Sequence, residues 1–364
     1  MDQKMNAAVV KAKGVICYEK IPEPEVHAGE VKVRVKACGI CGSDIPRALG
    51  DAAFFYPIVL GHEFVGEIAE VGGGVSEVIV GDTVAGIALK PCMCCEDCAR
   101  GDFGLCKNYS FLGSRENGAF ADYVVVPQKN VVKYDPQIPY REAVLFEPAS
   151  VAVHGLRVAG FTGGGTVAII GGGTIGIFVE QLCLAFGATK VVVLDIEQER
   201  LSMAQKYGCH GVVCTKEPNC VEQALTMTNG RGYDWVFEVA GQPATIKMSY
   251  KLAAARGSIC YIGFPHVSIT FEPRLWEQIN LKELRLVGSR MSYTAPFPGP
   301  DWTLTAHYLK TGQLKIDPDM IFKCYPMEAA AEAFKLFEEP GQVKGKIILE
   351  NKRQTACRGK NKER

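Results

Sequence analysis

A glycine-rich turn between an apolar strand and an apolar helix places the strongest single constraint on how this chain can fold. The segment VAIIGGGTIGIFVE, residues 167–180, has the spacing G-x-G-x-x-G. Glycines at these positions allow a tight turn, let the backbone approach a pyrophosphate and let the helix pack close to the strand. The helix N-terminus adds unpaired N–H groups that face an anion. The sequence therefore predicts a dinucleotide-binding unit whose cofactor contacts are Gly171, Gly173, Thr174, Ile175 and Gly176.

An acidic residue at the end of the next predicted strand supports this interpretation. Asp195 follows Gly176 by nineteen residues, where a carboxylate can accept hydrogen bonds from the hydroxyls of an adenosine ribose. An anion there also repels a 2′-phosphate, which favours NAD over NADP. Arg200, on the helix that follows, is a further predicted cofactor contact. The alternative is that Asp195 only caps that helix.

The pattern of apolar residues changes about 140 residues from the start of the chain. Short β-type runs separated by Gly and Pro fill the first part and predict an irregular antiparallel β domain. Strands then alternate with amphipathic helices, which predicts an α/β fold with a doubly wound parallel sheet. Two domains also suit the length of 364 residues. We place the β domain at residues 1–155 and 291–350, the cofactor domain at 156–290, and a disordered, basic tail at 351–364.

Five cysteines fall within PCMCCEDCARGDFGLC, residues 91–106. Four of them, Cys92, Cys95, Cys98 and Cys106, have the spacing C-x2-C-x2-C-x7-C, which lets one segment wrap a tetrahedral zinc ion with four thiolates. Such a site is closed and leaves no position for a substrate. Cys94 breaks the spacing and is predicted to point elsewhere. The cluster is thus interpreted as a structural zinc site.

A second set of metal-ligand types is spread along the chain. Cys41 and His62 are each flanked by glycine, and Glu147 lies in a mostly apolar stretch where an uncompensated carboxylate is costly to bury. Thiolate, imidazole and carboxylate suit a catalytic zinc ion that keeps a fourth position open. From spacing alone, three structural roles stay equally open: a free core thiol at Cys41, a hydrogen-bonded His62, and an ion-paired Glu147.

The ordered set of motifs resembles the zinc-dependent medium-chain alcohol and polyol dehydrogenase family. The segments that carry the likeness are GICGSD, GHEFVG, the cysteine cluster, GSRENGAFADY, FEPASVAVHG and VAIIGGGTIG. The resemblance implies a GroES-like catalytic domain and a Rossmann cofactor domain. It also implies that Cys41, His62 and Glu147 are the catalytic zinc ligands, with Glu63 beside the ion, and that Cys38 is a buried thiol.

The resemblance assigns roles to three further residues. Ser43 matches the hydroxyl that relays a proton from the substrate, and Asp44 is expected to orient His62 through its second ring nitrogen. For His154 we weigh a relay or cofactor contact against a hydrogen-bonded structural role, and favour the structural role.

The expected reaction is the NAD-linked oxidation of a secondary hydroxyl of a sugar alcohol to the keto sugar. The likeness is greatest to the members that act on polyol phosphates such as galactitol 1-phosphate, through CGSDIPR, FFYPIVLGHEF, FLGSRENGAFADY and SYTAPFPGPDW. A phosphate requires cationic donors, and the candidates are Arg47, Arg115 and Arg290, with Tyr56 lining the pocket. Each arginine could instead form a surface ion pair. The alternative substrate is an unphosphorylated polyol or secondary alcohol of the sorbitol, butanediol or threonine type.

The composition of the chain restricts the classes of partner that it is expected to bind. Lys plus Arg and Asp plus Glu both total 40, which leaves no basic excess for nucleic acid, and this counts against the remote alternative of a zinc-finger binding module without catalysis. The longest apolar run is too short to cross a membrane, and no signal-peptide pattern starts the chain, so a cytoplasmic protein is expected. The family resemblance implies a homodimer or homotetramer that pairs near residues 284–305.

Overall fold

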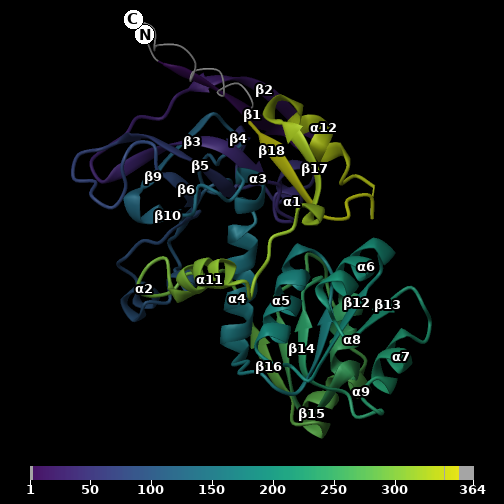
Figure 1. Ribbon diagram of the computed structural model, residues 1–364. Helices are drawn as coiled ribbons and strands as arrows, with labels where there is room; N and C mark the ends of the chain where they lie inside the picture. The colour runs from purple at the N-terminus through teal and green to yellow at the C-terminus, as the bar shows by residue number, and fades with distance from the viewer. Residues whose placement is uncertain (1–2, 340, 352–364) are drawn as a thin grey trace, which may run out of the picture. The chain divides into compact units, whose positions relative to one another are not determined.

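The computed structural model describes residues 3–339 and 341–351, and the chain divides into two compact units (Figure 1). Unit 1 contains the chain up to Glu147 and again from Ile316, and unit 2 runs from Pro148 to Lys315. Of the predicted tail, only residue 351 is described, and the remainder lies outside the described residues. No helix in the described ranges is both long and apolar enough to span a bilayer.

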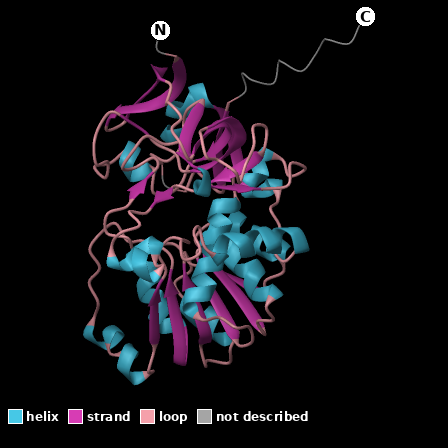
Figure 2. Ribbon diagram, turned by 90° about the vertical axis from the view of Figure 1, so that its left-hand side faces the viewer, coloured by secondary structure: helices cyan, strands magenta, loops and turns pink. Residues whose placement is uncertain are grey.

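Unit 2 is built on one parallel sheet, whose strands lie side by side in Figure 2. Its spatial order is β13-β12-β11-β14-β15-β16, and every neighbouring pair is parallel. This order, 3-2-1-4-5-6 in chain sequence, is the doubly wound arrangement that the alternating pattern predicts. The strands are β11 (Thr166–Ile170), β12 (Lys190–Asp195), β13 (Gly211–Cys214), β14 (Tyr233–Glu238), β15 (Ala253–Tyr261) and β16 (Arg285–Gly288).

The central strands of this sheet are buried on both faces. Each residue of β11 and β12 after the first is buried, which explains why both strands are nearly continuous runs of Val, Ile and Leu. Helices connect the strands and cover the sheet, and they supply the apolar partners of the core. They are α5 (Thr174–Ala185), α6 (Gln198–Tyr207), α7 (Cys220–Thr226), α8 (Pro243–Leu252), α9 (Pro273–Trp276) and α10 (Gln278–Leu281).

Unit 1 is mainly antiparallel β structure. A three-stranded sheet has the order β2-β1-β4, and a two-stranded sheet pairs β7 with β8. The largest sheet has the order β10-β6-β5-β3-β18-β17, with β9 also paired to β3. The strands are β1 (Lys4–Ala12), β2 (Val15–Pro22), β3 (Glu30–Gly39), β4 (Ile58–Val59), β5 (Glu63–Val71), β6 (Thr83–Gly86), β7 (Leu89–Lys90), β8 (Ser110–Phe111), β9 (Tyr123–Pro127), β10 (Val131–Lys133), β17 (Ile321–Pro326) and β18 (Lys346–Glu350).

The compact units divide the chain at other positions than the sequence predicts. Instead of boundaries at 155 and 290, the division falls at 147 and 315, so that residues 148–155 and 291–315 pack with unit 2. Buried polar contacts explain this, because Ser150 bonds Ser292 at 2.8 Å and Gln181 bonds the backbone of Lys315. The remaining helices are α1 (Ile45–Ala48), α2 (Glu96–Arg100), α3 (Tyr140–Ala143), α4 (Phe146–Ala159), α11 (Pro300–Thr311) and α12 (Ala330–Lys335).

Candidate functional site

The pairing of β3 with β5 brings Cys41 and His62 together. Gly39 at the end of β3 lies opposite Glu63 at the start of β5, so the residues just beyond these two strand ends meet at the same edge of the sheet. Cys41 follows β3, and His62 directly precedes β5. Ligand atoms of Cys41, His62 and Glu63 all lie within 4.8 Å of one another. Thiolate, imidazole and carboxylate at this spacing form a donor set that suits zinc.

Glycine at position 61 is required for His62 to reach this site. Gly61 has φ +93°, and a Cβ atom there would lie 2.5 Å from Phe120 and 2.9 Å from the sulfur of Cys38. Cys38 therefore packs behind the turn and is absent from the group of potential ligands. Burial raises the pKa of the Cys38 thiol well above its usual value, and the nearby carboxylate of Asp44 raises it too. The sequence prediction of a buried thiol at Cys38 agrees with this environment.

Asp44 joins the two candidate ligands. One of its carboxylate oxygens accepts the backbone N–H of Cys41 at 3.0 Å, and the other lies 3.3 Å from Nδ1 of His62. The second distance is within the range of an ion pair, and these two atoms do not form a hydrogen bond. Asp44 is fully buried, and its contact with Nδ1 leaves Nε2 of His62 available to a metal. The hydroxyl of Ser43 donates to the sulfur of Cys41 at 3.4 Å.

Two carboxylates adjoin these ligands, and their environments differ, since Glu63 is buried and Glu147 is half-buried. Glu63 accepts hydrogen bonds from the ammonium group of Lys346 with both oxygens, at 2.7 and 2.8 Å. Glu147 is not in the group of mutually close ligand atoms. Burial raises the pKa of Glu147 to about 7, and the charge of Glu63 raises it further. A divalent cation beside Glu147 would favour its charged form and so lower its pKa again. Glu63, in contrast, already has a cationic partner.

Lys346 is the site residue that sequence reasoning missed. On β18, Ile348 lies opposite Gly39 of β3, which places Lys346 beside the turn that contains Cys41. Burial alone would lower the pKa of Lys346, but the carboxylate of Glu63 raises it more, and the net direction is upward. A lysine ahead of an apolar terminal strand is an ordinary surface pattern, so only the pairing of β18 with β3 reveals this role.

The cysteine cluster forms a separate, compact group. The sulfur atoms of Cys92, Cys95, Cys98 and Cys106 lie within 4.8 Å of one another, and the pair Cys92–Cys106 is 3.5 Å apart. Cys94 is exposed and is not a member of the group. The backbone N–H of Cys94 lowers the pKa of Cys92 to about 6, which favours the thiolate that zinc binds. The group fits a closed tetrahedral zinc site.

The predicted dinucleotide turn is preorganised in unit 2. Gly173 is the N-cap of α5, and a Cβ atom at Gly176 would lie only 1.9 Å from the carbonyl oxygen of Gly171. The backbone N–H of Gly172 donates to Asp195 at 2.7 Å, which joins the turn to the end of β12. Glycine spacing, a helix N-terminus and an acid on the adjacent strand thus fit a bound dinucleotide.

Asp195 also organises the start of the next helix. Its other carboxylate oxygen accepts the backbone N–H of Glu197, and Glu197 rather than Asp195 is the N-cap of α6. The guanidinium of Arg200 lies 3.6 Å from Asp195, so both predicted cofactor residues sit at the end of β12. The alternative that Asp195 caps this helix is therefore wrong, although Asp195 supports the helix start from two positions before the cap.

Glu238 is a second residue that the sequence analysis did not select. It ends β14, the neighbour of β11, and one of its oxygens accepts the N–H groups of Ala240 and Gly241 and the hydroxyl of Thr245. Ala240 in turn lies against Gly171 of the dinucleotide turn. Burial raises the pKa of Glu238. An acid at the carboxyl end of a central parallel strand is the signal that identifies such a residue.

The predicted substrate residues are distributed over both units. Arg47, Tyr56 and Arg115 lie in unit 1 with the candidate zinc ligands, whereas Arg290 is an exposed residue of unit 2. His154 is also in unit 2, where Nδ1 contacts the buried carboxylate of Asp301 at 2.8 Å. This contact is the structural role favoured for His154.

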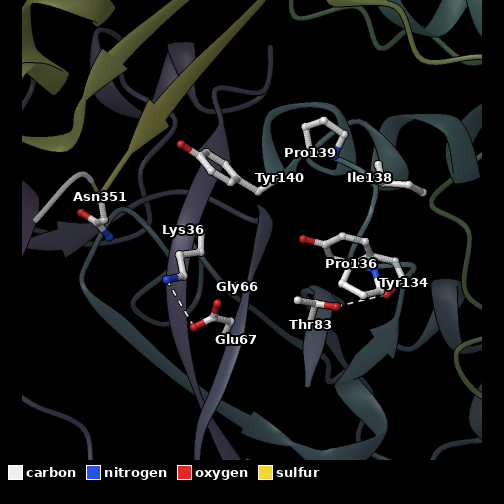
Figure 3. Close-up of a pocket in the computed structure, with 10 residues that line it drawn as sticks. All are labelled: Lys36, Gly66, Glu67, Thr83, Tyr134, Pro136, Ile138, Pro139, Tyr140 and Asn351. Carbon is white, nitrogen blue, oxygen red and sulfur yellow. Dashed lines mark hydrogen bonds and ion pairs between the residues drawn. The ribbon is translucent and has the colours of Figure 1, made fainter. Parts of the chain in front are cut away.

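A pocket of about 320 Å³ lies elsewhere in unit 1 and contains none of these residues (Figure 3). Tyr134, Pro136 and Pro139 line it, and Lys36 and Glu67 point toward each other across part of its wall, 3.2 Å apart. Because neither the candidate metal ligands nor the dinucleotide turn line it, this pocket is not the candidate site.

Comparisons with known proteins agree with both halves of this architecture. The family model described as alcohol dehydrogenase GroES-like domain matches residues 27–137, and that described as zinc-binding dehydrogenase matches residues 174–306. Galactitol 1-phosphate 5-dehydrogenase of Escherichia coli K12 is 33% identical over 346 residues, which cover 95% of this chain and 99% of that protein. The crystal structure of galactitol-1-phosphate dehydrogenase from Escherichia coli superposes with a TM-score of 0.89 over 95% of this chain and 100% of that one, also at 33% identity. Sorbitol dehydrogenase of Bacillus subtilis is 36% identical over 268 residues, covering 72% of this chain and 76% of that protein.

Proposed function

Because the chain belongs to the zinc-dependent medium-chain alcohol and polyol dehydrogenase family, we propose that it oxidises a secondary hydroxyl of a sugar alcohol to the keto sugar with NAD. The single observation that carries this proposal is the convergence of Cys41 and His62 at one edge of the β3–β5 pair, with buried acids beside them. When bound there, zinc supplies a Lewis acid that lowers the pKa of a substrate hydroxyl.

Each candidate site residue described in unit 1 has a defined part in this proposal. Cys41, His62 and Glu147 hold the catalytic ion, and Glu63, neutralised by Lys346, remains beside it. Asp44 fixes the loop of Cys41 and the ring of His62. Ser43, whose hydroxyl already reaches the sulfur of Cys41, accepts the proton that the substrate hydroxyl loses and passes it outward.

The residues of unit 2 hold the hydride acceptor. The turn at Gly171–Gly176 and the start of α5 receive the pyrophosphate, and Asp195 with Arg200 receives the adenosine ribose. When bound, NAD supplies the electrophilic ring that accepts the hydride. The second zinc ion belongs to the four-cysteine group, where it stabilises the fold and takes no part in the reaction.

The substrate proposed is a polyol phosphate such as galactitol 1-phosphate. The relative that acts on galactitol 1-phosphate covers nearly the whole chain, and unit 1 provides Arg115 and also Arg47, which bonds Ser43 close to Cys41. The second candidate is an unphosphorylated polyol, which the similarity to sorbitol dehydrogenase favours. Pairing of copies through β16, the edge strand of the parallel sheet, is part of the same proposal.

The test combines metal analysis with turnover. We expect about two zinc ions per chain and reduction of NAD with galactitol 1-phosphate. Glu147→Gln should lose the catalytic ion and activity, whereas Glu63→Gln should keep the ion. Zinc in both sites with no oxidation of any polyol, phosphorylated or neutral, would contradict the proposed reaction. Retention of the catalytic ion by Glu147→Gln would remove Glu147 from the ligand set.

A further inference from the structure

Arg115 is held by two aromatic rings. Its guanidinium carbon lies 4.4 Å from the ring centre of Tyr109 and 5.0 Å from that of Phe54. Phe54 is itself 62% exposed. Stacking against rings fixes the planar group and leaves its N–H edge able to donate. Arg115 is thus positioned, and its charge remains accessible.

Arg47 is held in a different way, close to the candidate zinc ligands. It donates to the backbone carbonyl of Ser43 at 2.5 Å, and Ser43 contacts Cys41. Its Nε atom is buried and has no hydrogen-bond partner. A buried N–H of a charged group is costly when it is not satisfied. The bond to Ser43 and the burial of Nε fix the Arg47 side chain beside the turn that contains Cys41.

One short segment connects the two arginines. Phe54 stacks on Arg115, and two residues later the hydroxyl of Tyr56 donates to the backbone carbonyl of Arg47 at 3.2 Å. The segment continues through Ile58 and leads to His62.

A second set of ring contacts runs from Arg115 to the same ligand. Tyr109, which stacks on Arg115, lies edge-on to Phe111, and Phe111 lies edge-on to His62 with ring centres 5.3 Å apart. Both arginines are therefore linked to the candidate metal ligands through intervening residues of unit 1, Arg115 through two aromatic rings and Arg47 through Ser43.

Neither arginine is neutralised by the protein. In the described parts of the chain, no acidic side chain pairs with Arg47 or Arg115, whereas Arg100, Arg141, Arg157, Arg231 and Arg256 all have such partners. Two cations without an acidic partner attract a dianion. A phosphate monoester carries close to two negative charges at neutral pH. Arginine binds phosphate through paired N–H groups, which gives both affinity and orientation.

We propose that Arg47 and Arg115 form a phosphate subsite that selects phosphorylated polyols over neutral ones, with Phe54 and Tyr109 as positioning residues for Arg115. The inference rests on the proposed function, because it assigns specificity to that same site. It also distinguishes between the three arginines that the sequence offers, since Arg290 lies in unit 2 and has other interactions.

The test compares one substrate pair, galactitol 1-phosphate and galactitol, in the zinc-loaded full chain with saturating cofactor. A lost charge-assisted contact corresponds to roughly a ten- to hundredfold change. Arg115→Ala should lower kcat/KM for the phosphate by that factor and change kcat/KM for the neutral polyol less than about threefold. Arg47→Ala also loses the bond to Ser43, so it should lower kcat/KM for both substrates, but by the larger factor for the phosphate. Phe54→Ala should raise KM for the phosphate with kcat nearly unchanged. Arg115→Lys should recover part of the loss, because the charge stays and the planar donor geometry is lost.

The matched control is Arg34→Lys, since Arg34 also stacks on a tyrosine of unit 1, 5.9 Å from the ring centre of Tyr123. It should leave both substrates unaffected. Inorganic phosphate should compete with galactitol 1-phosphate in the original protein, and less in Arg115→Ala. Equal losses of kcat/KM on both substrates in Arg115→Ala, or an unsubstituted protein that does not prefer the phosphate, would contradict the proposed subsite. Neither result would contradict the proposed dehydrogenase activity. Absence of turnover on both substrates would instead contradict the proposed function itself.

Discussion

Lys346 on β18 donates to the carboxylate of Glu63 on β5 at 2.7 Å, although 283 positions separate the two residues. The Glu63 side chain is 2% exposed and that of Lys346 is 10% exposed. Each charge therefore depends on the other for compensation, since an isolated buried ion is expensive. The pair also anchors the returning C-terminal strand at the edge where Cys41 and His62 meet.

Removing only the cation should be strongly destabilising. In Lys346→Met, the buried carboxylate of Glu63 loses its partner, and we expect a loss of about 3–5 kcal/mol in the free energy of unfolding. Glu63→Gln combined with Lys346→Met should recover much of that loss, because no uncompensated charge remains. Urea unfolding of both single variants and the double variant measures this coupling.

The exposed pair Lys13–Asp51 provides the control, with side chains 54% and 85% accessible. Lys13→Met should change stability by less than about 1 kcal/mol. A double variant that is as unstable as the sum of the two single variants would show that Glu63 and Lys346 do not compensate each other.

The cysteine cluster leads to a prediction about metal content. Cys95→Ser removes one of four thiolates from a closed site, so zinc should fall from about two ions to about one per chain, with a lower thermal midpoint. Cys94→Ser, at the position directly before it, should keep both ions because Cys94 is exposed and outside the group. Elemental analysis after dialysis distinguishes the two variants, and equal zinc loss in both would remove the four-cysteine assignment.

Glu180 on α5 should make unit 2 sensitive to alkaline pH. Its side chain is fully buried, one oxygen accepts the backbone N–H of Cys209, and the other has no hydrogen-bond partner. Burial raises the pKa of Glu180 to about 8. Because the folded-state pKa exceeds the unfolded value, the contribution to stability is complete below about pH 4.5 and is lost as pH rises through about 8.

Each tenfold change in proton affinity corresponds to about 1.4 kcal/mol, so a loss of a few kcal/mol across this range is expected. Glu180→Gln should flatten the dependence of the thermal midpoint on pH between about 5 and 9, the range that brackets the two pKa values. Glu222→Gln, at an exposed position of α7, serves as the control and should leave the dependence unchanged. If the thermal midpoint falls as steeply with rising pH in Glu180→Gln as in the unsubstituted protein, Glu180 is not the cause of the pH dependence.

Features set by local sequence were the ones that could be predicted. The six parallel strands follow from alternating apolar segments, and right-handed crossovers between parallel strands place the connecting helices over the sheet. The four-cysteine group follows from spacing within sixteen residues. The dinucleotide turn is likewise contained in one strand–turn–helix segment, and the structure places Gly171, Gly176 and Asp195 as the motif requires.

Features that depend on pairing of distant segments could not be predicted. Lys346 reaches Glu63 only because β18 adds to β3, and residues 291–315 join unit 2 through contacts such as that of His154 with Asp301. Phe54 contacts Arg115 only through the packing of two loops, so the sequence offered three arginines without ranking them. The third ligand of the catalytic zinc stays a prediction, because acids on two different segments, the buried Glu63 and the half-buried Glu147, adjoin Cys41 and His62.

Cofactor choice should depend on the charge at the end of β12. Asp195 is held by the N–H groups of Gly172 and Glu197, so its carboxylate cannot easily turn away from a ribose at this position. A 2′-phosphate there would meet this negative charge, whereas Arg200, 3.6 Å from Asp195, would attract it. The original protein is therefore expected to prefer NAD because Asp195 offsets Arg200.

Asp195→Ser should lower the ratio of kcat/KM for NAD to that for NADP by about ten- to hundredfold, since it removes the repulsion and leaves Arg200 unopposed. Adding Arg200→Ala should remove the gain with NADP, and this second variant separates a change in charge from a general loosening of the turn. Initial rates with both cofactors at one substrate concentration provide the measurement. An original protein that uses NADP as well as NAD would contradict the prediction, because the fixed carboxylate would then fail to exclude the 2′-phosphate.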